Sequence, residues 1–365
     1  MLKLSHVKKT FNRGTVTEKR ALTGVDLTLA DGDFVTVIGG NGAGKSTLLN
    51  MIAGVYPLDS GTVELDGEDI SRLSEPKRAK YLGRVFQDPM RGTAADMQIE
   101  ENLALAKRRG QRRTLRWGIT RAEREEYAEL LKKLDLGLET RMQAKVGLLS
   151  GGQRQALTLL MATLTNPRVL LLDEPFAAID AKIRKELRAW LKQTVRQLGV
   201  TSIFVTHDQE EAIEVADSII LTHAGRVEQA GAPAQIYAKP RTAFAASFFG
   251  DSVEVADASA LGSFAAGPGI VRSEHVSLTA EGEPFRYAAS TVRGTVADVA
   301  FRGRSVEVEV DVSGERLRST RSPEAPALHP GDEVGVFVYR LFAEGPDGSA
   351  RAVENGDLRE ESVVI

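Results

Sequence analysis

The stretch VIGGNGAGKSTLLNMIAG, residues 37–54, places glycines, a lysine and two hydroxyl groups between two apolar runs. Its segment GGNGAGKST, residues 39–47, matches the spacing G-x-x-x-x-G-K-[ST] of a phosphate-binding loop. Glycines let successive backbone N–H groups face one point, and the following helix presents its positive end there. Lys45 can reach β- and γ-phosphate oxygens, and the Ser46 hydroxyl can ligate a Mg²⁺ that bridges them. The loop therefore predicts a polyphosphate site.

The loop needs a strand before it and a helix after it. Residues 34–38 form an apolar run typical of a buried strand, and residues 48–53 have helical periodicity. A glycine-rich turn whose lysine points into solvent is the alternative interpretation. The flanking strand and helix favour the phosphate-binding loop.

Two carboxylates follow a second apolar run, RVLLLDEP at residues 168–175. In phosphate-loop enzymes the first acid, here Asp173, holds Mg²⁺ through its water shell, and the second, Glu174, polarises an attacking water. Neighbouring strand residues face opposite ways, but both can address one ligand where the chain turns at the strand end. An exposed strand end that carries two acids by chance is the alternative.

A second anion site is predicted at LLSGGQRQ, residues 148–155. Ser150, Gly151 and Gly152 lead into a helix that begins near Gln153, so their backbone N–H groups and the serine hydroxyl lie at a helix N-terminus. A simple helix cap is the usual interpretation of such a segment. Its position about twenty residues before LLLDEP favours a functional role.

Taken in order, these motifs resemble the ATP-binding cassette family, the ATPase subunits of ABC transporters, over roughly residues 1–250. GGNGAGKST resembles the Walker A loop, LSGGQ the signature and LLLDEP the Walker B strand. Gln87 in VFQDP matches the Q-loop, residues 178–180 in AAID match the D-loop, and His207 in FVTHD matches the switch histidine. Phe11 stands where the family usually has an aromatic ring that stacks on adenine.

The resemblance implies several sets of site residues and the cofactors ATP and Mg²⁺. Those that bind ATP are Phe11, Gly39, Gly40, Asn41, Gly42, Ala43, Gly44, Lys45, Ser46 and Thr47. Those of the signature, which cover the ATP of a partner chain, are Ser150, Gly151, Gly152 and Gln153, with Asp180 in the D-loop. The catalytic residues are Glu174, His207 and Gln87, and the Mg²⁺ residues are Ser46, Gln87 and Asp173.

Each carried-over position also has a structural interpretation. Gln87 can be a surface amide, His207 a core histidine bonded to its backbone neighbours, and Phe11 an ordinary core aromatic. His207 follows the predicted strand 202–205, where a parallel sheet presents its ligand edge. The resemblance further implies a head-to-tail dimer, a homodimer or a pair of ABC ATPase subunits, that closes over ATP.

The elements that must position these residues alternate along the first part of the chain. Strands are predicted at residues 2–7, 21–29, 34–38, 62–65, 169–172, 202–206 and 218–222. Helices are predicted at residues 45–53, 121–134, 153–165, 182–198 and 209–216. The alternation predicts an α/β fold, a P-loop ATPase with a helical subdomain, whose sheet is largely parallel with an antiparallel region near the N-terminus.

After residue 250 the pattern changes to short strands separated by glycine and proline, at residues 269–278, 291–299, 306–312 and 333–339. GIVRSEHVSLT, residues 269–279, resembles the VRPEH-type strand of the small OB-like regulatory domain of importer ATPases, with Ser273 in place of proline. We therefore expect an ATPase domain at 1–240, and a linker with a small all-β, TOBE-like regulatory domain at 241–365. The segment at residues 343–362 is predicted to be poorly ordered.

Composition narrows the function classes. The 365 residues carry a formal net charge of −3, which argues against a general nucleic-acid binder, and no cysteine, which excludes cysteine chemistry. No apolar stretch approaches the ~18 residues of a membrane span, so we expect a peripheral protein at the cytoplasmic face of the membrane. The basic run KRRGQRRTLR, residues 107–116, favours a solvated face over contact with lipid headgroups or nucleic acid.

The resemblance implies membrane partners, namely integral permease subunits and an external solute-binding protein. The segment from Asp173 onward resembles sulfate/thiosulfate importer ATPases, whereas residues 83–120 resemble ATPases of a tryptophan/tyrosine-type uptake group. Sulfate or thiosulfate is the first expected solute, and an amino acid is the alternative. A soluble ABC ATPase without a transport role is a further alternative, although such proteins carry two cassettes per chain and only one set of motifs is found here.

Overall fold

Strand β3, which precedes the glycine loop of residues 39–47, lies inside a six-stranded sheet with the order β10-β9-β3-β8-β7-β6. Its strands are β3 (Phe34–Ile38), β6 (Leu82–Val85), β7 (Val169–Asp173), β8 (Thr201–Val205), β9 (Ser218–His223) and β10 (Arg226–Gly231). Neighbouring strands pair in parallel except β9 with β10. Every residue of β3 and β8 is buried, as expected for strands covered on both faces. This confirms the predicted largely parallel sheet.

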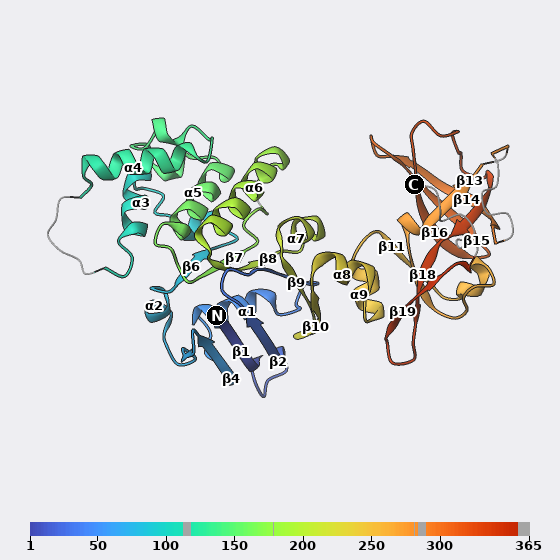
Figure 1. Cartoon of the computed structure of the whole chain (residues 1–365), viewed down its shortest axis with the longest axis horizontal. Helices are drawn as coiled ribbons and strands as arrows, with labels where there is room; N and C mark the ends of the chain where they lie inside the picture. Colours follow the sequence, from blue (N-terminus) through green and yellow to red (C-terminus); the bar gives the residue numbers. More distant parts are fainter. Residues whose placement is uncertain (112–117, 178, 281, 284–289, 357–365) are drawn as a thin grey trace. The chain divides into compact units, whose positions relative to one another are not determined.

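The computed structural model describes residues 1–111, 118–177, 179–280, 282–283 and 290–356, and the chain divides into two units, Met1–Pro233 and Ala234–Ile365 (Figure 1). Three predicted features fall partly outside these residues. They are the basic run from residue 112 to 116, Ala178 of the D-loop, and the end of the segment predicted to be poorly ordered.

A second, antiparallel sheet has the order β2-β1-β4-β5. Its strands are β1 (Leu2–Phe11), β2 (Lys19–Leu29), β4 (Ser60–Leu65) and β5 (Glu68–Asp69). Helix α1 (Lys45–Ala53) packs between the two sheets, because one apolar cluster joins Leu4 of β1, Leu49 of α1 and Leu171 of β7. The predicted antiparallel region near the N-terminus is thus confirmed, and it fixes the helix that follows the glycine loop.

The other face of the parallel sheet is covered by helices, which lie together on one side of β6, β7 and β8 in Figure 1. The α-helices on this face are α3 (Ile99–Lys107), α4 (Arg121–Lys132), α5 (Gly151–Thr163) and α6 (Ala181–Leu198). Helices α2 (Glu75–Arg78) and α7 (Gln209–Val215) and the 3₁₀ turns Pro89–Gly92, Leu138–Thr140 and Val146–Leu148 complete the unit. The predicted helices are confirmed, while helices α2 and α3 and strands β5, β6 and β10 were not predicted.

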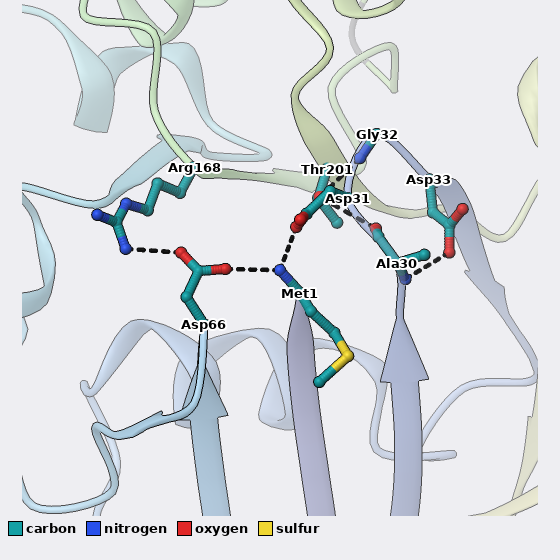
Figure 2. Close-up of polar contacts among 8 residues, drawn as sticks. All are labelled: Met1, Ala30, Asp31, Gly32, Asp33, Asp66, Arg168 and Thr201. Carbon is teal, nitrogen blue, oxygen red and sulfur yellow. Dashed lines mark hydrogen bonds and ion pairs between the residues drawn. The ribbon is translucent and has the colours of Figure 1, made fainter.

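The amino ends of the strands are tied together by polar contacts (Figure 2). The ammonium group of Met1 binds the carboxylates of Asp31 and Asp66, and Asp66 also accepts a 2.6 Å bond from Arg168, just before β7. The N–H of Gly32 donates to Thr201 Oγ1 at the start of β8, over 3.1 Å. These contacts join both sheets at the edge opposite to the glycine loop.

A buried arginine fixes the far end of α1. Arg78 is 1% exposed, and its guanidinium donates to the carbonyls of Leu73, Ser71, Met51 and Ile52 over 2.8–2.9 Å. Four carbonyl acceptors satisfy a charge that would otherwise be costly to bury. Arg78 therefore anchors the C-terminal turn of α1 without reaching the glycine loop at its N-terminus.

The second unit contains two antiparallel sheets, with the orders β11-β12-β18-β19 and β13-β17-β14-β15-β16. The strands are β11 (Ser252–Val255), β12 (Gly269–Arg272), β13 (Val276–Thr279), β14 (Val292–Phe301), β15 (Val306–Val312), β16 (Glu315–Arg321), β17 (Glu333–Val338), β18 (Arg340–Glu344) and β19 (Ala350–Glu354). Helices α8 (Pro233–Ala238) and α9 (Ala243–Phe248) precede them, and 3₁₀ turns lie at Ala258–Leu261 and Ser273–His275. Inward-facing aliphatic side chains of both sheets form one core.

Two expectations for this unit are corrected. The single strand predicted at residues 269–278 is broken by the 3₁₀ turn Ser273–His275, because its two halves pair in different sheets, β12 with β11 and β18, and β13 with β17. The segment predicted to be poorly ordered instead contains the end of β18 and all of β19, which pair through residues such as Phe342 and Ala352. Across the part of the chain that the structure describes, no helix is both long and apolar enough to cross a membrane.

Candidate functional site

The loop of residues 39–47 connects β3 to α1, as predicted. Lys45 Nζ folds back and donates to the carbonyl oxygens of Gly39, over 2.7 Å, and Gly40, over 3.1 Å. Burial lowers the pKa of the Lys45 ammonium, and the carboxylates of Glu174 and Asp173 act in the opposite direction. The loop is therefore closed around its own lysine, whose positive charge faces the two acids.

Two glycines of the loop are required by close backbone approach. A Cβ atom at Gly39 would lie 2.2 Å from the carbonyl oxygen of Thr222 on β9, and one at Gly44 would lie 2.5 Å from that of Ala21 on β2. Gly44 also has φ +96°, the left-handed region that favours glycine. Neighbouring strands thus press on the loop at both ends and leave no room for a side chain.

The other loop positions differ in exposure. Gly40, Asn41 and Gly42 are exposed, whereas Ala43 is buried and donates its N–H to the Gly40 carbonyl over 3.2 Å. Thr47 is half-buried in the first turn of α1. The exposed part of the loop is the part that a ligand can approach.

The first acid lies beside the loop serine. Ser46 Oγ is 3.3 Å from Asp173 Oδ1 at the end of β7. Burial raises the pKa of Asp173, and the Ser46 hydroxyl and the charges of Arg84 and Lys45 oppose that rise. A hydroxyl and a carboxylate are hard oxygen donors of the kind that Mg²⁺ prefers. Among the described residues, no group of three or more acids or histidines could hold a metal ion.

The second acid is the meeting point of three segments. Glu174 has φ +43°, and its N–H donates to the Val205 carbonyl at the end of β8 over 2.9 Å. Its Oε2 accepts a 3.0 Å hydrogen bond from Gln87 Nε2, which follows β6, and lies 3.2 Å from His207 Nδ1, which follows β8. The structure therefore brings together Glu174, Gln87 and His207 from positions far apart in the sequence.

The backbone on both sides of His207 is fixed by hydrogen bonds, while its ring stays accessible to solvent. Its side chain is 62% exposed, so it is not a core histidine. The buried Thr206 hydroxyl donates to Glu211 Oε2 over 2.8 Å and accepts from the Asp208 N–H over 3.0 Å. Asp208 in turn caps α7 by accepting from the Glu211 N–H. This network fixes the backbone on both sides of the histidine.

The signature residues lie at the N-terminus of α5, as predicted. Ser150 Oγ accepts from the Gln153 N–H over 3.3 Å, and Gln153 Oε1 accepts from the Ser150 N–H over 3.2 Å, which is a capping box. Gly151 is exposed and Gly152 is buried. Asp180 caps α6 by accepting from the Ile183 N–H over 3.1 Å. Among the described residues, no hydrogen bond or ion pair joins these segments to the glycine loop or to the two acids.

The candidate adenine residue lies at the end of β1. Phe11 is half-buried, and the Tyr56 ring meets it edge-on with centroids 5.2 Å apart. Lys9 Nζ lies 5.6 Å from the centroid of the Phe11 ring and donates to the Pro57 carbonyl over 2.8 Å. The aromatic ring is thus supported from one edge and partly open to solvent.

Several residues of the site were missed by the sequence analysis. Arg84 on β6 donates to Asn50 Oδ1 over 2.6 Å, and Asn50 Nδ2 donates to the Ser46 carbonyl over 2.8 Å. Gln155, which is 3% exposed, donates to the Phe86 carbonyl over 3.4 Å and so supports the segment that carries Gln87. An arginine in a four-residue strand and a glutamine within an apolar helix were the available signals, but neither predicts a partner.

A glycine loop that opens a helix, beside a strand that ends in two acids, defines a phosphate-loop nucleotide hydrolase. Comparison with known proteins narrows this class. The model of the ABC transporter family matches residues 22–177, and that of the TOBE domain matches residues 270–338. The sulfate/thiosulfate import ATP-binding protein CysA of Rhodopseudomonas palustris is 38% identical over 350 residues, 89% of this chain and 95% of that protein.

Two further relatives align over a similar extent, and one solved structure aligns over a smaller part of the chain. CysA 1 of Chromobacterium violaceum is 40% identical and covers 90% of this chain, aligned to 95% of its own length. The uncharacterized ABC transporter ATP-binding protein YdcT of Escherichia coli is 36% identical over 88% of this chain and 92% of its own length. The dimeric structure of the cassette MJ0796 has a TM-score of 0.56 and 31% identity, over 64% of this chain and 99% of that one.

The chain belongs to the ABC transporter family of ATP-binding proteins, and it is an ABC-type ATPase. This confirms the family and the fold class predicted from the sequence, including the small all-β domain after the ATPase.

The packing around the glycine loop predicts how an added methyl group changes the stability of the protein. Gly39→Ala should destabilise the nucleotide-free protein by about 1–3 kcal/mol, because the Cβ would overlap the Thr222 carbonyl and strain the backbone. Gly40→Ala is the matched control, since no atom lies within 4 Å of its added Cβ. Urea unfolding of both variants measures the difference, and equal stabilities would contradict this account of the loop.

Proposed function

We propose that this ATPase hydrolyses ATP with Mg²⁺ to energise a membrane importer, with sulfate or thiosulfate as the solute. The observation that carries the hydrolytic part is the separation of two adjacent acids. Asp173 is paired with the loop serine, whereas Glu174 faces an amide and an imidazole. This separation supports a cation-binding role for the first acid and a proton-transfer role for the second.

In this proposal the loop residues 39–47 and Phe11 bind ATP. Lys45 exchanges its bonds to the Gly39 and Gly40 carbonyls for phosphate oxygens, which a protonated ammonium binds more strongly. Ser46, Asp173 and Gln87 would hold Mg²⁺ through oxygen atoms, and the bound cation would neutralise charge on the phosphates.

Glu174 is assigned the role of general base, and His207 and Gln87 orient it. Gln87 Nε2 and His207 Nδ1 both contact one oxygen, Oε2 of Glu174. A carboxylate that accepts two such contacts is held in one rotamer, so a water bound to it would have a fixed direction of attack. The open ring of His207 can in addition contact a phosphate, because its side chain is largely exposed.

A second cassette completes the site in this proposal, as a homodimer or with a paired ABC subunit. Ser150, Gly151, Gly152, Gln153 and Asp180 lie at helix N-termini that have no bond to the glycine loop among the described residues. An anion site without its own phosphate loop is what a head-to-tail partner needs. The similar cassette MJ0796 has a dimeric structure, which supports pairing of two cassettes.

The importer assignment rests on relatives that align with most of the chain. Two relatives that span it, CysA of Rhodopseudomonas palustris and CysA 1 of Chromobacterium violaceum, are named import ATP-binding proteins. We assign residues 1–240 to the nucleotide-binding domain and 241–365 to the linker and the regulatory domain. The partners are then integral permease subunits and an external solute-binding protein, with the chain at the cytoplasmic face of the membrane and no nucleic acid bound.

Sulfate or thiosulfate is favoured because these anions are named in several of the relatives. The alternative is an aromatic amino acid, which the resemblance of residues 83–120 favours. An ABC ATPase without a transport role is the remaining alternative.

Two substitutions should affect ATP binding and ATP hydrolysis separately. Lys45→Ala should weaken ATP binding about 10- to 100-fold, because it removes charge-assisted bonds to phosphate. Glu174→Gln should keep ATP affinity and lower the rate of phosphate release at least about 100-fold, because only the base is lost. Glu186→Gln, on the exposed face of α6, is the control for a charge change alone. Turnover near that of the unmutated chain in Glu174→Gln would refute the role of base.

ATP should drive association of the Glu174→Gln chain, because ATP that is not cleaved would add contacts to the partner chain that only the dimer has. Adding Ser150→Arg should abolish this association by placing bulk and charge in the second anion site. Ser74→Arg, an exposed cap residue of α2, is the matched control and should dimerise normally. Light scattering with and without ATP measures the mass, and a monomer at high protein and ATP concentrations would count against the dimer.

The importer proposal predicts a complex with integral membrane proteins. Affinity purification of the chain from its native membrane should recover permease subunits by mass spectrometry. Cells should take up labelled sulfate in a manner that depends on the unmutated chain and is lost with Glu174→Gln. Uptake of labelled tryptophan without uptake of sulfate would make an aromatic amino acid the solute in place of sulfate. Purification of the chain without any integral membrane partner would overturn the transport role.

A further inference from the structure

An arginine points at the metal-binding side of the site from a strand that was not predicted. Arg84 lies in the middle of β6, opposite Leu171 of β7 in the parallel register. Partners in a ladder share a face of the sheet, and so do residues two apart on one strand. Arg84, Leu171 and Asp173 therefore lie on the same face, the one that α1 covers.

The side chain of Arg84 is only 15% exposed, and its bonds lead to α1. Its Nη2 donates to Asn50 Oδ1 over 2.6 Å, and Asn50 Nδ2 donates to the Ser46 carbonyl over 2.8 Å. The hydroxyl of Ser46 in turn lies 3.3 Å from Asp173 Oδ1. An unbroken chain of contacts thus runs from β6 through the first turns of α1 to the end of β7.

The surroundings of Arg84 fix its geometry. Its guanidinium carbon lies 4.4 Å from the centroid of the Phe86 ring, and its Nη1 lies 3.7 Å from Glu75 Oε1. The carboxylate of Glu75 offsets part of the positive charge of Arg84, and the guanidinium keeps a directed bond to Asn50. Stacking and a fixed fork of donors are properties of arginine that lysine lacks.

We propose that Arg84 is a positioning residue that, through Asn50, sets the Ser46 and Asp173 oxygens for the cation that accompanies ATP. This inference rests on the proposed Mg²⁺-dependent function and adds a residue that touches neither ATP nor the cation. Residues behind the ligands of a metal orient them, and their loss typically weakens metal binding or activity about 10- to 100-fold.

The test separates nucleotide binding from the response to the cation. A fluorescent ATP analogue is titrated onto the full chain without Mg²⁺, and Mg²⁺ is then titrated at saturating analogue. In Arg84→Met we expect the metal-free affinity to stay within about twofold and the Mg²⁺ concentration for half-maximal effect to rise about 10- to 100-fold. Asn50→Leu should give a similar rise although Arg84 is retained, and Arg84→Lys should fall between Arg84→Met and the unmutated chain.

Arg78→Lys is the matched control, because Arg78 is a second buried arginine bonded to α1, at the end away from Ser46. It should lower the thermal midpoint and leave the Mg²⁺ response unchanged. Equal loss of metal-free and metal-bound affinity in Arg84→Met, or a rise in Arg78→Lys as large as in Arg84→Met, would overturn the proposal. A stronger Mg²⁺ response in Arg84→Met would also overturn it, because repulsion by the arginine would then outweigh its bonds. If the unmutated chain shows no response to Mg²⁺, the proposed function fails first and this inference with it.

Discussion

The parallel register of three central strands is the constraint on which the site depends. Val37 of β3 and Asp173 of β7 both pair with Val205 of β8, so the three strands end in one row. Gly39 of the glycine loop lies two residues after Val37, Glu174 directly follows Asp173, and His207 lies two residues after Val205. A slip of one residue in either pairing would turn Asp173 to the opposite face and remove it from Ser46.

The end of β8 has a double role in this arrangement. The Val205 carbonyl accepts the Glu174 N–H, and two residues later the chain reaches His207. Two consecutive acids on a regular strand would face opposite sides, but Glu174 adopts φ +43° and turns the chain at that point. Such a backbone costs about 1–3 kcal/mol for a residue other than glycine, and it persists because the hydrogen bond to β8 and the contacts of the carboxylate hold it. The strain therefore lies where the chemistry is placed.

The sequence predicted those parts of the molecule in which local pattern and tertiary structure agree. The strand Phe34–Ile38 and the helix Lys45–Ala53 were placed to the residue, because a buried apolar run and a glycine turn are local signals. Strand β6 was not predicted, because LGRV is short and contains an arginine whose burial depends on Asn50, 34 residues earlier. The break in the strand at Ser273 likewise depends on distant pairing, because β13, which follows the break, pairs with β17 in the other sheet. Partners far along the chain are what a single sequence leaves unspecified.

Helix α5 connects the signature residues to the segment that carries Gln87 within the first unit. Its first residues are the signature, and further along Gln155 supports the Phe86 carbonyl while Arg154 contacts Met90. On the same helix, Thr158 packs so closely on Gly92 that an added Cβ would lie 3.0 Å from its methyl carbon. The segment that carries Gln87 is therefore fastened to α5 at three points, and Gln87 itself donates to Glu174. Because packed interiors transmit displacement rather than absorb it, these contacts link α5 mechanically to the amide that orients the proposed base.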